Sequence, residues 1–242
     1  MDIHLKDLLI GVVALCAAYI IFVALFTIYR ISIASALSAK AVPFSLSGSG
    51  TGPRILVVGD STGVGTGSAS PELSVPGRLA AHLSASLLIN RAKNGAKVGE
   101  VTAQFVDLPH ERFDLVLIQA GGNDIIRFTG GVQLRADTQA LLRKAHEHGE
   151  HVVFMSTGDV GTASIFLPPL GLLYDRRTRA AREIFIETAR EENVIYVDLF
   201  KEPKDEPFSK DPKRFYAADG FHPSEEGYAI WFEQLKAKLP SL

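Results

Sequence analysis

The alternation of two apolar patterns constrains the fold of this chain most strongly. From Arg54 onward, short apolar runs of strand length alternate with stretches in which apolar residues recur at the 3.6-residue period of a helix. The predicted strands are 55–59, 88–91, 115–120, 151–155 and 194–199, and the predicted helices are 75–88, 98–108, 134–148, 177–191 and 225–239. This alternation predicts an α/β fold with a parallel sheet covered by helices on both faces. In such folds, ligands bind beyond the carboxyl ends of the strands.

The N-terminal region carries an uncharged apolar run from Leu8 to Tyr29. As a helix, these roughly 22 residues would span about 33 Å, which is enough to cross the hydrocarbon core of a bilayer. We therefore expect residues 1–30 to form a single-pass membrane anchor. A cleaved signal peptide is the alternative, because Ala36-x-Ser38-Ala39 fits a cleavage site, although signal peptides usually have a shorter apolar region and more basic charge than Lys6 provides.

The charges of the chain limit its partners. The formal net charge of the 242 residues is −2, which argues against nucleic acid or another polyanion as a partner. Lys6 lies on one side of the apolar run, and Arg30 and Lys40 lie on the other. Basic residues therefore do not assign the C-terminal part to either side of a membrane. Neither charge nor composition indicates an oligomeric state.

The chain divides into an anchor, a connector and one domain. Residues 31–53 form the predicted connector, because Ser, Gly and Pro dominate the stretch after Lys40. Residues 54–242 form the predicted domain. The flexible part of the connector, from Lys40 to Pro53, has about 14 residues and reaches at most roughly 50 Å, so this domain would work close to the bilayer surface.

The segment from Ile55 to Gly63 is a strand-like run that stops at a serine in a glycine-rich turn. Glycines allow backbone angles that let a serine hydroxyl stand clear of the sheet with backbone N–H groups beside it. Ser61 is therefore a candidate nucleophile. Taken alone, Gly-Asp-Ser also fits an ordinary turn in which Asp60 or Ser61 caps the next helix. We expect Asp60 to be a structural brace and not a second base.

Three later segments supply the groups that a serine nucleophile needs. They are Asn94-Gly95, Gly121-Gly122-Asn123-Asp124 and Asp219-Gly220-Phe221-His222-Pro223. His222 can take the proton from Ser61, and Asp219 can hold the other imidazole nitrogen. The backbone N–H groups of Ser61 and Gly95 and the side-chain amide of Asn123 are candidate oxyanion donors.

In their order and residues, these four segments resemble the conserved blocks of the SGNH hydrolases, also called GDSL esterases and lipases. The resemblance extends from about Arg54 to Leu239, and one departure is Thr62, where the family often has leucine or isoleucine. It implies a three-layer α/β/α sandwich with the flavodoxin-like strand order 2-1-3-4-5. It also implies the roles given above to Ser61, His222, Asp219, Gly95 and Asn123, with no metal and no organic cofactor.

The resemblance implies a serine esterase that cleaves carboxylic esters or thioesters through an acyl-serine intermediate. Closeness to the bilayer and the apolar stretch 165–173 favour a lysophospholipid or another lipid-like ester as substrate, with acetylated cell-envelope polysaccharide as the second candidate. Phe166, Leu167 and Leu170 are candidate substrate-binding residues, although this stretch could equally fold into the core. An acyltransferase would use the same serine, and a non-catalytic membrane-tethered scaffold is a further alternative.

Overall fold

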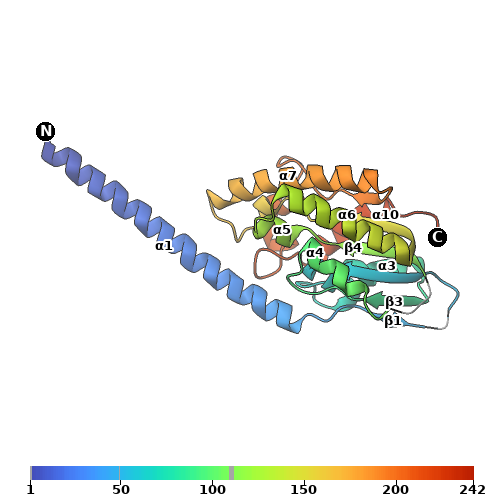
Figure 1. The fold of residues 1–242 in the computed structure, drawn as a ribbon. Helices are drawn as coiled ribbons and strands as arrows, with labels where there is room; N and C mark the ends of the chain where they lie inside the picture. The colour runs from blue at the N-terminus through green and yellow to red at the C-terminus, as the bar shows by residue number, and fades with distance from the viewer. Residues whose placement is uncertain (1, 49, 109–111) are drawn as a thin grey trace.

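The structure is a computed structural model, and it describes residues 2–48, 50–108 and 112–242. A single long helix, α1 (Asp2–Lys40), projects from an α/β sandwich that contains the remaining elements (Figure 1). The sandwich confirms the predicted α/β class and its layers.

The strands assemble in the predicted parallel order. Among the described residues, the sheet has the order β1-β3-β2-β4-β5-β6, in which every neighbouring pair is parallel except β1 with β3. Numbered along the chain, the five parallel strands have the order 2-1-3-4-5. The strands are β1 (Leu46–Ser47), β2 (Arg54–Gly59), β3 (Leu87–Asn90), β4 (Phe113–Gln119), β5 (Gly149–Met155) and β6 (Ile195–Val197).

Successive residues of the central strands enter two different cores, one on each face of the sheet. Leu56 and Val58 of β2 pack with residues of α4 (Val98–Val101), α6 (Gly131–His148) and α7 (Leu170–Glu191). Ile55 and Val57 pack with residues of α3 (Val75–Leu83) and α10 (Glu225–Lys236) on the opposite face. Burial on both faces explains why these strands are continuously apolar in the sequence.

Short helices occupy the connections. They are α2 (Ser61–Val64), α5 (Gly122–Ile126), α8 (Pro207–Lys210) and α9 (Pro212–Phe215), together with the 3₁₀ turns η1 (Pro71–Leu73), η2 (Thr102–Phe105) and η3 (Val160–Thr162). The predicted helix 98–108 is thus divided into α4 and η2, and helical structure ends before Asp107, whose φ is +55°. The predicted helix 177–191 begins earlier, at Leu170, so the second half of the apolar stretch 165–173 is helical.

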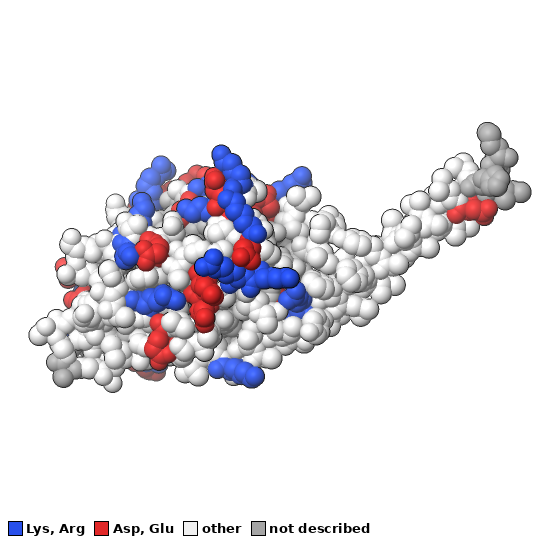
Figure 2. Space-filling view, turned by 180° about the vertical axis from the view of Figure 1, so that it is seen from behind, with Lys and Arg blue, Asp and Glu red and all other residues white. Residues whose placement is uncertain are grey.

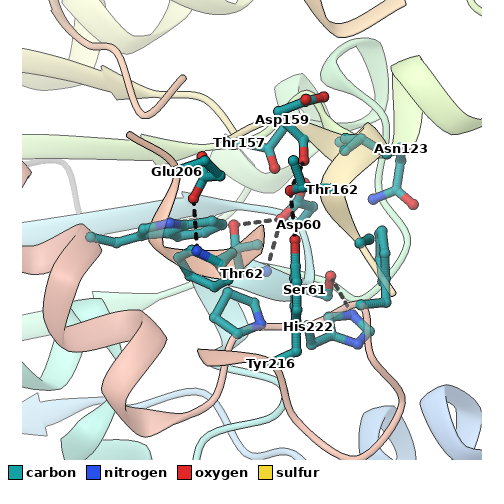
Figure 3. Close-up of a pocket in the computed structure, with 18 residues that line it drawn as sticks. Asp60, Ser61, Thr62, Asn123, Thr157, Asp159, Thr162, Glu206, Tyr216 and His222 are labelled. Atoms are coloured by element: carbon teal, nitrogen blue, oxygen red, sulfur yellow. Dashed lines mark hydrogen bonds between the residues drawn. The ribbon is translucent and has the colours of Figure 1, made fainter. Parts of the chain in front are cut away.

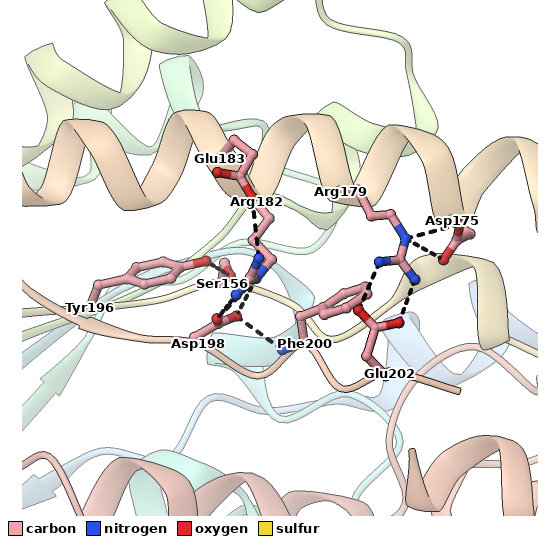
Figure 4. A network of polar contacts seen from close by, with 9 residues as sticks. All are labelled: Ser156, Asp175, Arg179, Arg182, Glu183, Tyr196, Asp198, Phe200 and Glu202. Carbon is pink, nitrogen blue, oxygen red and sulfur yellow. Dashed lines mark hydrogen bonds and ion pairs between the residues drawn. The ribbon is translucent and has the colours of Figure 1, made fainter. Parts of the chain in front are cut away.

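Two arginines of α7 hold the segment that follows β6 (Figure 4). Arg182 donates to Asp198 at 2.6 Å, and Arg179 donates to both carboxylate oxygens of Glu202 at 2.9 Å. The ring of Phe200 lies beneath both guanidinium groups, with its centroid 4.7 Å from Arg179 Cζ and 5.3 Å from Arg182 Cζ. These bidentate and stacked contacts fix the start of the long segment that leads to the C-terminal loop.

Helix α1 is long and apolar enough to span a membrane. Figure 2 shows its projecting part free of charged side chains between the acidic residue near its N-terminal end and the sandwich. The helix continues to Lys40, through the first part of the connector predicted at 31–53, because residues 31–40 contain alanine and neither Gly nor Pro. It ends shortly before Pro43. The division into residues 1–30, 31–53 and 54–242 stays a prediction.

Candidate active site

Strand β2 delivers Ser61 to the carboxyl edge of the sheet through a tight turn at Gly59. Gly59 has φ +149°, and a Cβ atom there would lie 2.0 Å from the carbonyl oxygen of Gln119 on β4. Only glycine tolerates this close approach. The N–H of Asp60 donates to the same carbonyl at 2.8 Å, and Ser61 is then the first residue of α2. The turn thus separates the serine hydroxyl from the strand.

The side chain of Gln104 clamps this turn from a position 45 residues later in the chain. Its Oε1 accepts a hydrogen bond from Gly59 N at 2.7 Å, and its Nε2 donates to Gly59 O at 2.8 Å. Gln104 is buried, so it satisfies two backbone groups that water does not reach. The sequence does not reveal this residue, because a lone glutamine on a predicted helix carries no signal of a long-range contact.

Ser61, His222 and Asp219 come together as a buried chain of hydrogen bonds. Ser61 Oγ lies 3.0 Å from His222 Nε2, and His222 Nδ1 lies 2.5 Å from Asp219 Oδ2. Figure 3 shows Ser61 and His222 facing each other in the pocket. The exposed fractions are 7% for Ser61, 6% for His222 and 0% for Asp219. The loop 219–222 holds the pair compactly, since Asp219 Oδ1 also accepts the backbone N–H groups of Phe221 and His222 at 2.9 and 3.0 Å.

These contacts set the protonation of the histidine–aspartate pair. Burial by itself raises the pKa of Asp219, but the hydrogen bond from His222, its charge and the two backbone donors together hold the pKa below its usual value. An ionised carboxylate only accepts hydrogen bonds, so His222 Nδ1 carries a proton. In the neutral imidazole, Nε2 is then the acceptor for the Ser61 hydroxyl. This is the tautomer that a general base for serine requires.

The side chain of Asp60 forms hydrogen bonds within the turn that contains it. Its Oδ1 accepts hydrogen bonds from the backbone N–H and the hydroxyl of Thr62 at 2.8 and 2.7 Å. Burial raises its pKa to about 6. Asp159 and Glu206 line the same small cavity of about 40 Å³, and burial raises their pKa values as well (Figure 3). The geometry of Asp60 agrees with the expected structural brace. The two neighbouring acids lie far from Asp60 in the sequence, which carries no signal that they share its cavity.

Gly95 and Asn123 lie beside Ser61, on the segments that follow β3 and β4. Both line one cavity together with Ser61 and His222. Gly95 has φ +77°, a left-handed conformation that favours glycine. Asn123 Nδ2 donates to the carbonyl of Ala96 at 3.1 Å, which uses one of its two N–H groups and ties the two segments together.

Asp124 braces the segment that carries Asn123. Its Oδ2 accepts from Val98 N at 2.9 Å, and its Oδ1 accepts from the hydroxyl of Thr129 at 3.0 Å. Asp124 therefore joins α5 to the start of α4 and to the turn that follows α5. The position of Asn123 is thus fixed from both sides.

The cavity in front of Ser61 has a volume of about 580 Å³ and largely apolar walls. Phe166 lines it and packs against Tyr174, with ring centroids 4.2 Å apart and ring planes inclined by 38°. Leu170 lines a neighbouring hollow of about 490 Å³, whereas Leu167 lines neither of these two hollows. One wall of the 580 Å³ cavity comes from α1, through Thr27, Ile31, Ala34, Ser35 and Ser38.

A parallel α/β sandwich with a buried serine, histidine and aspartate at the carboxyl edge of its sheet defines a serine hydrolase. Residues 57–230 match the model of the GDSL-like Lipase/Acylhydrolase family. This match covers well over half of the chain, and the chain therefore belongs to that family, whose members act on ester bonds.

The chain is also similar to individual proteins. It is 30% identical over 207 residues to a GDSL-like esterase of Mycobacterium tuberculosis, a match that covers 79% of this chain and 60% of that protein. A structure from Slackia heliotrinireducens assigned to the SGNH hydrolases has a TM-score of 0.62 at 21% identity, over 78% of this chain and 100% of the other. A lipase/acylhydrolase from Enterococcus faecalis has a TM-score of 0.55 at 20% identity, over 78% and 99%. The structural matches show the shared fold.

Proposed function

We propose that this protein is a membrane-anchored serine esterase in which Ser61, His222 and Asp219 are the catalytic residues. The observation that carries the proposal is the 3.0 Å contact between Ser61 Oγ and His222 Nε2, with Nδ1 of the same ring held by Asp219. This arrangement provides an acceptor for the serine proton at the required atom.

The reaction follows from these contacts. Ser61 Oγ attacks the ester carbonyl carbon while its proton moves to His222 Nε2. The bond to the leaving alcohol then breaks, the alcohol takes that proton, and the acyl group stays on Ser61. Water gives a proton to His222 and attacks the acyl-serine, which releases the carboxylic acid and returns the proton to Ser61. Asp219 stabilises the imidazolium that forms in each step.

The oxyanion donors in this proposal are Ser61 N–H, Gly95 N–H and Asn123 Nδ2. Ser61 begins α2, so its N–H has no partner within the helix. The second N–H of the Asn123 amide can donate while the first binds Ala96 O. Three donors from three segments around Ser61 would stabilise the negative charge that develops on the carbonyl oxygen.

The substrate in this proposal is a lysophospholipid or another lipid-like ester. The apolar helix α1 supports attachment to a membrane, and Phe166, Ile126 and Ile165 give the cavity beside Ser61 apolar walls. An apolar cavity of about 580 Å³ suits a hydrocarbon chain better than a hydrated sugar.

Pre-steady-state hydrolysis of a p-nitrophenyl ester tests the chemistry. Wild-type protein is expected to release a burst of about one nitrophenol per active site, and Ser61→Ala is expected to release none. The kcat/KM for a lysophospholipid is then compared with that for an acetylated oligosaccharide. A higher value for the lysophospholipid supports the lipid assignment, and the reverse order would assign the protein to carbohydrate acetyl esters.

A further inference from the structure

The C-terminal part of α1 contacts the sandwich, whereas its N-terminal part projects away from it. Tyr19 OH donates to Pro168 O at 2.7 Å, and Arg30 Nη1 donates to Ala218 O at 2.6 Å. Nearer its C-terminal end, the carbonyl of Ser38 accepts from Asn94 Nδ2 at 2.9 Å. At 1.5 Å per residue, the stretch of α1 between the first and last contacts is about 28 Å long.

The half-buried residues of this part of α1 lie along one face of the helix. They recur at intervals of three or four residues, which is the spacing of one helical stripe. They are Val23, Phe26, Thr27, Arg30, Ile33, Ala34, Leu37 and Ser38. The stripe follows the contact with the sandwich, and two hollows lie beside it.

The two hollows adjoin at one residue of α1. The inner hollow is the 580 Å³ cavity that contains Ser61 and His222. The outer hollow, of about 490 Å³, lies between α1 and the segment Pro168–Leu170. Thr27 lines both. We call the outer hollow the outer groove, and its α1 wall consists of Tyr19, Ile20, Val23, Ala24, Thr27 and Ile28.

The walls of the outer groove are apolar. The residues that line it include no charged side chain, and the one phenol among them, Tyr19, already donates to Pro168 O. An uncharged groove that adjoins the cavity of the nucleophile suits the hydrocarbon part of an ester whose carbonyl lies at Ser61.

The outer groove lies at the level of the charge-free part of α1. Tyr19 to Ile28 fall within the run from Leu8 to Tyr29, and the first charged residue after that run is Arg30. The start of α7 extends the apolar surface at this level, where Leu172 is 68% exposed. Figure 2 shows that charged side chains gather over the sandwich, whereas the projecting arm shows none on this face between the acidic residue near its tip and the sandwich. In a bilayer, the outer end of the groove would therefore face hydrocarbon.

We propose that the outer groove binds the hydrocarbon chain of a membrane lipid ester and guides its carbonyl from the bilayer to Ser61. Helix α1 is then a wall of the substrate site in addition to an anchor, and the substrate class is a long-chain ester that resides in the membrane. This inference rests on the proposed function, because it needs Ser61 to be acylated.

Filling the groove tests the proposal. Ala24→Phe places a ring in the outer groove, and Ala17→Phe makes the same change on α1 at a residue that does not line it. The readout is the ratio of kcat/KM for palmitoyl ester to kcat/KM for butyryl ester, in detergent-solubilised full-length protein. Ala24→Phe is expected to lower this ratio by about tenfold, which corresponds to lost burial of roughly two methylene groups. Ala17→Phe is expected to leave the ratio unchanged. An unchanged ratio in Ala24→Phe would overturn the proposal.

A photochemical experiment on the wild-type protein avoids any effect of substitution on folding. A long-chain alkyl fluorophosphonate with a diazirine near the chain end is attached to Ser61, and irradiation then links the chain to its neighbours. Crosslinks within residues 19–28 or 168–170 are the expected result, and crosslinks confined to other segments would overturn the groove assignment. Absence of attachment to Ser61 would instead refute the proposed function itself, so the two failures are distinguishable.

Discussion

The substitution Asp60→Asn is expected to stabilise the protein in a pH-dependent way. Burial raises the pKa of Asp60 from 3.8 to about 6 in the folded state. The folded state therefore holds a proton more tightly than the unfolded state, and the stability of the wild type falls as the pH rises from about 4 to about 6. A pKa difference of roughly two corresponds to about 3 kcal/mol of unfolding free energy. Asparagine avoids this cost, because it carries no charge at any pH and its carbonyl can still accept from Thr62.

Urea unfolding followed by tryptophan fluorescence measures the free energy of unfolding of each variant. Trp231 is the only tryptophan in the sequence and lies 7% exposed in the core, so its signal reports on the sandwich and not on α1. The expected difference between Asp60→Asn and wild type is near zero at pH 4 and up to about 3 kcal/mol at pH 7.

Asp205→Asn, which changes an exposed carboxyl, is the control and is expected to alter stability by less than about 0.5 kcal/mol. A constant difference across this pH range in Asp60→Asn, or destabilisation at pH 7, would refute the reasoning from burial. As a brace, Asp60 is also expected to be replaceable with retention of activity within about tenfold, and a loss of more than about a thousandfold would mean that it takes part in the chemistry.

Three further substitutions test the site. Gln104→Ala leaves the buried N–H and C=O of Gly59 unpaired and should lower the unfolding free energy by about 2–6 kcal/mol. Its control, Gln133→Ala, loses one exposed hydrogen bond and should lower the unfolding free energy by less than about 1 kcal/mol. Equal effects of the two substitutions in urea unfolding would contradict the proposed role of Gln104. Asp219→Asn should lower kcat by about 10⁴-fold, because an amide does not select the Nδ1–H tautomer of the histidine. Steady-state ester hydrolysis measures kcat, and a decrease in kcat of less than tenfold would argue against the proposed role of Asp219. Asn123→Ala should lower kcat by roughly 10²–10³ with little change in KM, and a change confined to KM would remove it from the oxyanion site.

The parts of the fold that the sequence predicted are those encoded by local patterns. Apolar runs such as 115–120 overlap the observed strands, here β4 (Phe113–Gln119), because a strand buried on both faces needs a largely apolar sequence. Ser61 and Asn123 were identified for a similar reason, since glycines and polar residues interrupt the pattern directly after apolar runs. His222 was identified instead from the segment Asp219-Gly220-Phe221-His222-Pro223. The strand order came from the family resemblance.

The parts that the sequence did not predict depend on contacts between distant segments. Gln104 reaches Gly59 across 45 residues, and no feature near either residue indicates this pairing. The packing of α1 along the rim of the site depends on single hydrogen bonds such as Tyr19 OH to Pro168 O, 149 residues apart. The composition of α1 is that of a helix that can span a membrane, and nothing in it indicates that Thr27 and Ser61 line the same cavity.

Labelling with a fluorophosphonate probe tests the central claim most directly. The full-length protein in mild detergent is treated with the probe, and the labelled peptide is identified by mass spectrometry beside Ser61→Ala and His222→Ala. The account predicts stoichiometric labelling of the wild type at Ser61, none in Ser61→Ala, and labelling slowed by several orders of magnitude in His222→Ala, because Ser61 then lacks its base. Folded wild-type protein that does not react, or a label found on another residue, would contradict the assignment of Ser61 as the activated nucleophile.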